Sequence, residues 1–84
     1  MRKQFRKAMI RYFRIALLQE RANKTQEEMA EILDISIRAY QKLEAGITSC
    51  SIYTFWRFWV YVCTDRKAFL SGFFHVMDSI DEAA

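Results

Sequence analysis

Apolar residues recur at helical spacing along most of the chain. Positions separated by three and four residues lie on one face of a helix. The clearest run spans residues 29–43, with one break at Asp34–Ile35, and consists of Met29, Ile32, Leu33, Tyr40 and Leu43. The sequence has no proline, only two glycines and no internal repeat. Since long linkers and turns need such residues, this pattern predicts an all-α fold.

Residues 25–46 have the signals of two short helices joined by a tight turn. Thr25 is suited to cap the first helix, and Glu28 three residues later completes a capping box. Ser36 offers a second cap, and Gly46 a C-terminal stop. We therefore expect helices over 25–33 and 36–45. A helix–turn–helix of this size fits the major groove of DNA.

A longer helix precedes this pair. We expect it from Arg2 to Ala22, ending at Asn23, which tolerates the left-handed conformation. It has two apolar arcs and therefore needs two partners. The narrow arc is expected to join the core of the helix pair, and the broad arc to pack on another element of the chain or on a second copy. The arcs are Ile15, Leu18 and Ala22 (narrow) and Phe5, Met9, Phe13 and Leu17 (broad).

Two helices are expected after the pair. The first is capped by Ser51 and runs to about residue 63; the second is capped by Thr64–Asp65 and covers 66–79, with Gly72 as a kink or a close-packing point. Their expected core residues are Ile52, Phe55, Phe58, Trp59 and Val62, then Phe69, Leu70, Phe73, Met77 and Ile80. A second stripe of Tyr53, Trp56 and Val60 is more apolar surface than the solvent-facing side of a monomer carries, which favours an interface.

Positive charge is concentrated in the first third of the chain. Residues 1–24 hold eight basic residues and only Glu20 as an acid, whereas residues 25–49 and 50–84 have net charges of −3 and −1. Four of the basic residues form a strip along the first helix: Lys3, Lys7, Arg14 and Arg21. A basic arm beside a groove-sized helix favours a polyanionic partner.

Other chemistry is not indicated. Carboxylates are not paired as in a catalytic site, no glycine-rich phosphate loop is present, and His75 stands alone, so we expect no enzyme, no cofactor and no metal. Cys50 and Cys63 fit small apolar core residues better than a disulfide or zinc site. No apolar run is long enough to cross a membrane, and we expect a cytoplasmic protein.

The residues of the helix pair also resemble a known family. Thr-Gln-Glu-Glu-x-Ala-Glu-x-Leu, then Ile-Ser, then Tyr-x-Lys-x-Glu-x-Gly is similar to the phage repressor/Cro-type (xenobiotic-response-element) helix-turn-helix family. The motif covers 25–46, and the looser likeness about 11–70. The resemblance implies one compact five-helix, lambda-repressor-like domain over 1–84, here with an N-terminally extended first helix.

The resemblance also implies which residues contact DNA. Base edges would be reached by Ile37, Arg38 and Lys42 of the recognition helix, and Arg38 is the best reader because its guanidinium matches both guanine acceptors. Backbone contacts would come from Gln26, Ser36, Gln41, Thr48 and Ser49. Three departures stand out: Asp34 replaces the usual turn glycine, residues 47–51 lack the usual basic residues and proline, and Gln19 replaces the arginine that pairs with the family glutamate, here Glu44. Arg21 or Arg14 could compensate.

These features predict a sequence-specific, DNA-binding transcriptional regulator that acts as a repressor. It would act as a homodimer on a palindromic operator in double-stranded DNA, with two recognition helices about 34 Å apart. The alternative is a protein-interaction module of the same fold, similar to an antitoxin, that binds a protein partner and reads little or no DNA.

Overall fold

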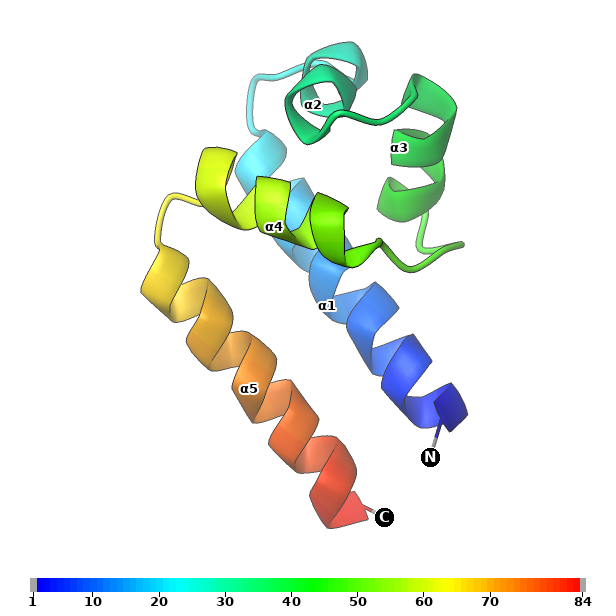
Figure 1. Ribbon diagram of the computed structural model, residues 1–84, viewed down its shortest axis with the longest axis vertical. Helices are drawn as coiled ribbons and strands as arrows, with labels where there is room; N and C mark the ends of the chain where they lie inside the picture. The colour runs from blue at the N-terminus through cyan, green and yellow to red at the C-terminus, as the bar shows by residue number, and fades with distance from the viewer. Residues whose placement is uncertain (1, 84) are drawn as a thin grey trace.

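Five helices account for most of residues 2–83, which are the residues that the computed structural model describes (Figure 1). They are α1 (Arg2–Arg21), α2 (Gln26–Leu33), α3 (Ile37–Glu44), α4 (Ile52–Tyr61) and α5 (Arg66–Ala83). These residues contain no strand. The all-α prediction is confirmed; α4 ends two residues earlier than expected, and α5 continues four residues further.

The helix ends follow the capping chemistry of the sequence. The Thr25 hydroxyl accepts from the Glu28 amide at 3.1 Å, and the Glu28 carboxylate accepts from the Thr25 amide at 3.0 Å, which completes the capping box. Asp34 takes the left-handed conformation at φ 58°, and Gly46 does so at φ 74°. At the end of α1 the left-handed residue is Ala22 (φ 48°) and not Asn23, because the turn closes earlier through the Lys24 amide and the Arg21 carbonyl.

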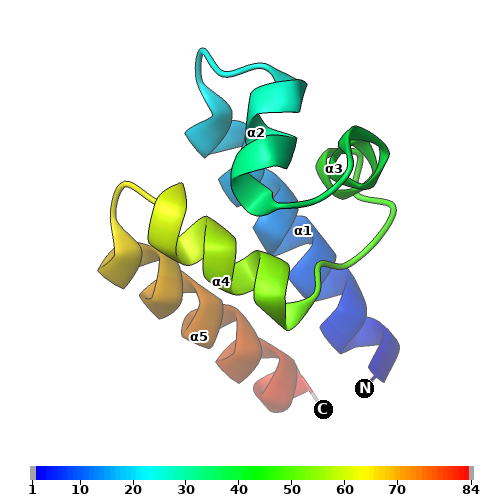
Figure 2. The ribbon, with the colours of Figure 1, turned by 45° about the horizontal axis from the view of Figure 1, so that its top comes forward.

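The other four helices pack around α1. Helices α2 and α3 lie across its C-terminal half, and α3 contacts it directly; α4 packs on α2, and α5 runs back along α1 in the opposite direction (Figures 1 and 2). Both described chain ends therefore lie at the same end of the molecule (Figure 1). The chain extends over 38 × 25 × 20 Å.

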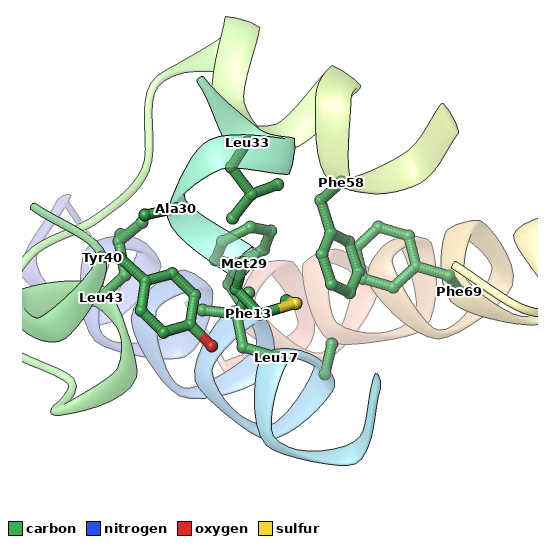
Figure 3. Close-up of a cluster of buried hydrophobic side chains, with 10 residues drawn as sticks. Phe13, Leu17, Met29, Ala30, Leu33, Tyr40, Leu43, Phe58 and Phe69 are labelled. Carbon is green, nitrogen blue, oxygen red and sulfur yellow. The ribbon is translucent and has the colours of Figure 1, made fainter. Parts of the chain in front are cut away.

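The core is where α1 meets the other four helices. Figure 3 shows its side chains converging from all five helices: Phe13, Leu17, Met29, Ala30, Leu33, Tyr40, Leu43, Phe58 and Phe69. The expectation for α1 was wrong in one respect. Its narrow arc is not the core face, since Ile15 and Leu18 are 46% and 44% exposed. The broad arc supplies Phe13 and Leu17 instead, because α3, α4 and α5 all lie on that side.

The first residue of α4 is a second exception. Ile52 was expected in the core but is 83% exposed, because at the start of the helix it projects beyond the core toward the open end between α1 and α5. There it lines an apolar pocket of about 330 Å³, together with Phe5, Met9, Phe55 and Phe73. On α5, Phe69 is buried, Leu70, Phe73 and Ile80 are half-buried, and Met77 is exposed.

Helix α5 packs tightly against α1 at Gly72. The Tyr12 hydroxyl donates to the Phe69 carbonyl and lies where a side chain on Gly72 would begin, and two carbons of the Tyr12 ring lie 3.2 Å from that point. Of the two alternatives for Gly72, a kink or a close-packing point, the structure shows the second, within a continuous helix.

We expect Gly72→Ala to destabilise the protein by about 1 kcal/mol. Alanine improves helix propensity by about 1 kcal/mol, but forcing Tyr12 away costs about 1–3 kcal/mol. In a Tyr12→Phe background the obstructing hydroxyl is gone, so the same change should be neutral or stabilising. Chemical denaturation of the wild type, the two single variants and the double variant measures this coupling. An equal loss in both backgrounds would contradict the proposed contact.

Candidate nucleic-acid interface

Helix α3 buries one side and exposes the other. Tyr40 and Leu43 are buried in the core. Ile37, Arg38, Gln41 and Lys42 are exposed on the remaining surface. Apart from the hydrogen bond of Gln41 to Gln26, these four side chains form no hydrogen bond or ion pair within the described part of the chain. The exposed side of α3 is thus free to contact a partner.

The Glu44 carboxylate joins three helices at the base of this surface. It accepts from Arg21 Nη1 of α1 at 2.8 and 3.0 Å, from Gln26 Nε2 of α2 at 3.0 Å, and from the Tyr40 hydroxyl at 2.6 Å. The partner in α1 is Arg21 and not Gln19, whose side chain lines a depression beside Thr64 on another side of α1. An ion pair is therefore retained, two residues from the aligned position.

These contacts shift the pKa values of Glu44 and Tyr40. Burial alone would raise the pKa of Glu44, but the hydrogen bonds from Tyr40 and Gln26 and the Arg21 guanidinium outweigh it, so the pKa is lowered. Burial, and then the hydrogen bond to Glu44, raise the pKa of Tyr40. Glu44 is therefore a carboxylate and Tyr40 a neutral phenol at neutral pH, the protonation states in which these hydrogen bonds form.

Gln26 connects the start of α2 to the surface of α3. Its Oε1 accepts from Gln41 Nε2 at 3.1 Å, while its own amide group donates to Glu44. A primary amide has two N–H donors, so one is left for another acceptor. The network therefore orients both glutamines at the junction of the two helices.

The remaining expected contact residues are less uniform. The Ser36 hydroxyl accepts from the Ala39 amide at 3.0 Å as the cap of α3, which leaves its O–H free to donate. In the loop after α3, Thr48 is half-buried and Ser49 is exposed. Ser49 lines the apolar pocket between α1, α4 and α5.

Arg14, the other arginine considered as a partner for Glu44, contacts its backbone carbonyl and not its carboxylate. Arg14 Nε of α1 donates to the Glu44 carbonyl at 2.8 Å, at the end of α3. Lys7, Arg11 and Arg14 line a shallow depression whose other wall is Ala45 and Gly46. Lys7 and Arg14 belong to the strip predicted from the sequence, and Arg11 to the same basic first third of the chain, but their position beside the end of α3 depends on how α1 and α3 pack.

Comparison with known families agrees with this geometry. A family model described as helix-turn-helix matches residues 15–58, which is more than half of the chain. The chain belongs to this Cro/repressor-type helix-turn-helix family. The matched region begins in α1 and ends in α4, so the motif proper is α2 and α3, and the first thirteen residues of α1 and all of α5 lie outside it. No curated protein and no solved structure matches the chain.

The two cysteines are free thiols in this helix-turn-helix domain. Both are half-buried against the core, and burial raises the pKa of each thiol to about 11. No helix of the described residues is long and apolar enough to span a membrane.

We expect Glu44→Gln to destabilise the domain by about 1–3 kcal/mol, since hydrogen bonds to a charged group are lost. The loss should depend on pH. Because the folded pKa lies below the ordinary value of 4.5, the carboxylate stabilises the fold fully above about pH 4.5, and this contribution vanishes as the pH falls through the folded pKa.

Thermal unfolding of the wild type and Glu44→Gln between pH 7 and 3 tests this. The difference in Tm should shrink below about pH 4. Substitution of the exposed Glu31 by Gln is the control and should give a small, constant difference. A Glu44→Gln difference that is equally large at pH 3 would show that Glu44 does not act through its charge.

Proposed function

We propose that this protein is a sequence-specific transcriptional regulator, a repressor that binds a palindromic operator as a homodimer. Membership of the DNA-binding helix-turn-helix family supports the DNA-binding part. The observation that carries the proposal is the exposed side of α3, whose side chains have almost no partner within the described residues. The hydrogen bonds of Glu44 to Arg21, Gln26 and Tyr40 orient this helix on α1 and α2. A rigid helix with free cationic side chains suits the major groove of double-stranded DNA.

Three side chains of α3 are proposed to read bases. Arg38 is exposed and can donate both arms of its guanidinium to guanine O6 and N7. Lys42, one turn further along α3, can reach a neighbouring guanine. Ile37, at the start of the helix, can contact a thymine methyl group. Together they would specify a short half-site.

Other residues are proposed to bind phosphates and so position the helix. The free N–H of Gln26, the Ser36 hydroxyl and Gln41 lie along the junction of α2 and α3. Thr48 and Ser49 follow α3 and would contact the backbone there; Ser49 has the weaker case because it borders the apolar pocket. Such contacts add affinity without sequence preference.

Arg38→Ala should weaken operator binding by about 1–3 kcal/mol and relax the preference at one base position. The operator is first selected from a random duplex pool, and affinities are then measured by fluorescence anisotropy. Lys67→Ala, which removes one positive charge from the exposed start of α5, is the matched control. Unchanged affinity and specificity for Arg38→Ala would refute its assigned role.

The homodimer is proposed to form through the apolar pocket beside the loop that follows α3. Ile52 is strongly exposed there, next to Phe5 of α1 and Phe73 of α5. A second copy on this side would bury Ile52 and also place the two α3 helices near a common two-fold axis. Dimeric helix-turn-helix proteins need such an axis to space their recognition helices by about 34 Å.

Ile52→Asp should convert the dimer to a monomer. The substitution is compatible with folding, because Ile52 is exposed and an acidic residue in the first turn of α4 is favourable. Ile15→Asp, an exposed position on α1 away from this pocket, is the control and should stay dimeric. Sedimentation equilibrium distinguishes the two, and a dimeric Ile52→Asp would rule out this interface.

A second candidate function, binding of a protein partner, is supported by the outer face of α4. Arg57 is held by the Ile32 carbonyl at 2.7 and 2.9 Å and lies over the rings of Tyr53 and Tyr61, beside the exposed Trp56. Tryptophan, tyrosine and arginine dominate the binding energy of protein interfaces. Affinity for random duplex DNA as a function of salt separates the candidates: without salt-dependent binding, the partner-binding reading is favoured.

A further inference from the structure

A row of basic side chains on α1 runs beside the helix-turn-helix. Lys7 and Arg11 are exposed and four residues apart, so they share one face of α1, with Lys3 one turn before them. Lys7, Arg11 and Arg14 line a depression of about 330 Å³, and the end of α3 forms its other wall through Ala45 and Gly46. In both ribbon views α1 lies between α3 and α5, so α3 is on the side of α1 away from α5 (Figures 1 and 2).

Arg14 fixes the row relative to α3. Its Nε donates to the Glu44 carbonyl at 2.8 Å, and a Cβ placed on Gly46 would lie only 3.1 Å from its Cδ. The two helices are therefore in close contact at this point. Arg11 and Lys7, about one and two turns before Arg14, extend along the same groove at about 5.4 Å per turn.

The stability of α1 does not account for these charges. The helix begins with Arg2 and Lys3 and has no acidic residue in its first turn, where a helix favours acids and disfavours cations. Helix α2, in contrast, begins with Glu27 and Glu28. Among the side chains of residues 2–80, the single ion pair is Arg21–Glu44, so no carboxylate there neutralises Lys7 or Arg11.

We propose that Lys7 and Arg11 bind the DNA sugar–phosphate backbone next to the groove that α3 enters, with Arg14 as the residue that positions them. This inference rests on the proposed function and extends its contact surface to a segment outside the family match, which begins at residue 15. The row supplies the positive charge that the loop over 47–51 lacks. It would carry affinity rather than sequence preference.

An anionic membrane surface is the competing partner for a basic helix. It is disfavoured because membrane binding needs apolar side chains beside the cations, directed outward. Here Met9 and Phe5, the apolar neighbours of Lys7, line the pocket that α1 forms with α4 and α5. Lys7 and Arg11 instead border the recognition motif.

The test compares the salt dependence of DNA binding between two charge-matched variants. The double variant Lys7→Gln/Arg11→Gln removes the row. The control Arg6→Gln/Lys67→Gln removes the same charge from the apolar-pocket side of α1 and from α5. Binding of the full chain to a random 30-base-pair duplex is followed by anisotropy from 50 to 200 mM salt, and circular dichroism verifies that both variants are folded.

The slope of log affinity against log salt should fall by about 0.9 for each lost phosphate contact, or about two per chain, in the first variant alone. The affinity lost between 50 and 200 mM salt then shrinks by about tenfold per chain. The melting temperature should be unchanged or higher, which a structural role would not give. Lys7→Arg/Arg11→Lys should retain the wild-type slope.

Three results would overturn the inference. If Lys7→Gln/Arg11→Gln keeps the wild-type slope while Arg38→Ala relaxes specificity, the row does not contact DNA, although the proposed function stands. If the wild type shows no salt-dependent binding to duplex DNA, both fail together. If the double variant loses binding to phosphatidylglycerol vesicles and keeps the wild-type salt dependence of DNA binding, the basic row binds an anionic lipid surface and not DNA.

Discussion

The rest of the structure depends on the partly buried charge of Glu44. A carboxylate removed from water is stable only if hydrogen bonds and an opposite charge replace its hydration. Here Arg21, Gln26 and Tyr40 supply them from three helices, so the ion pair is satisfied only when α1, α2 and α3 are all in place. The same contacts that stabilise the fold therefore set the angle at which α3 is presented.

Most of the positive charge of the domain lies outside the helix-turn-helix motif. The helix-turn-helix itself is acidic apart from Arg38 and Lys42, and its following loop has no basic residue. Affinity for a polyanion must then come from elsewhere, and α1 lies close enough to provide it because Arg14 contacts the end of α3. Under the proposed function, base recognition by α3 and phosphate binding by α1 would be separate, so sequence preference could change in α3 with little effect on general affinity.

The domain has two apolar surfaces, the outer face of α4 and the pocket between α1, α4 and α5, and they differ in how much of each is covered by the chain itself. On the outer face of α4, Arg57 bonds to α2 and covers tyrosine rings, so this aromatic cluster is already ordered. The pocket between α1, α4 and α5 is still open, with Ile52 exposed at its rim. Large apolar residues exposed to water raise the free energy of the protein, and covering them lowers it. For this reason we propose the pocket, and not the outer face of α4, as the site for a second copy.

By itself, the sequence determined the features that depend on near neighbours. Thr25 with Glu28, Asp34, Ser36 and Gly46 defined the helix ends of the motif, because caps and left-handed turns involve residues at most a few positions apart. The periodicity also identified Tyr40 and Leu43 as buried and the opposite side of α3 as exposed. Only the tertiary structure decided which arc of α1 is buried, that Arg21 rather than Gln19 meets Glu44, and that Arg14 reaches the end of α3. Each of these depends on where distant helices lie, and a helix with two apolar arcs and eight nearby cations is compatible with several such packings.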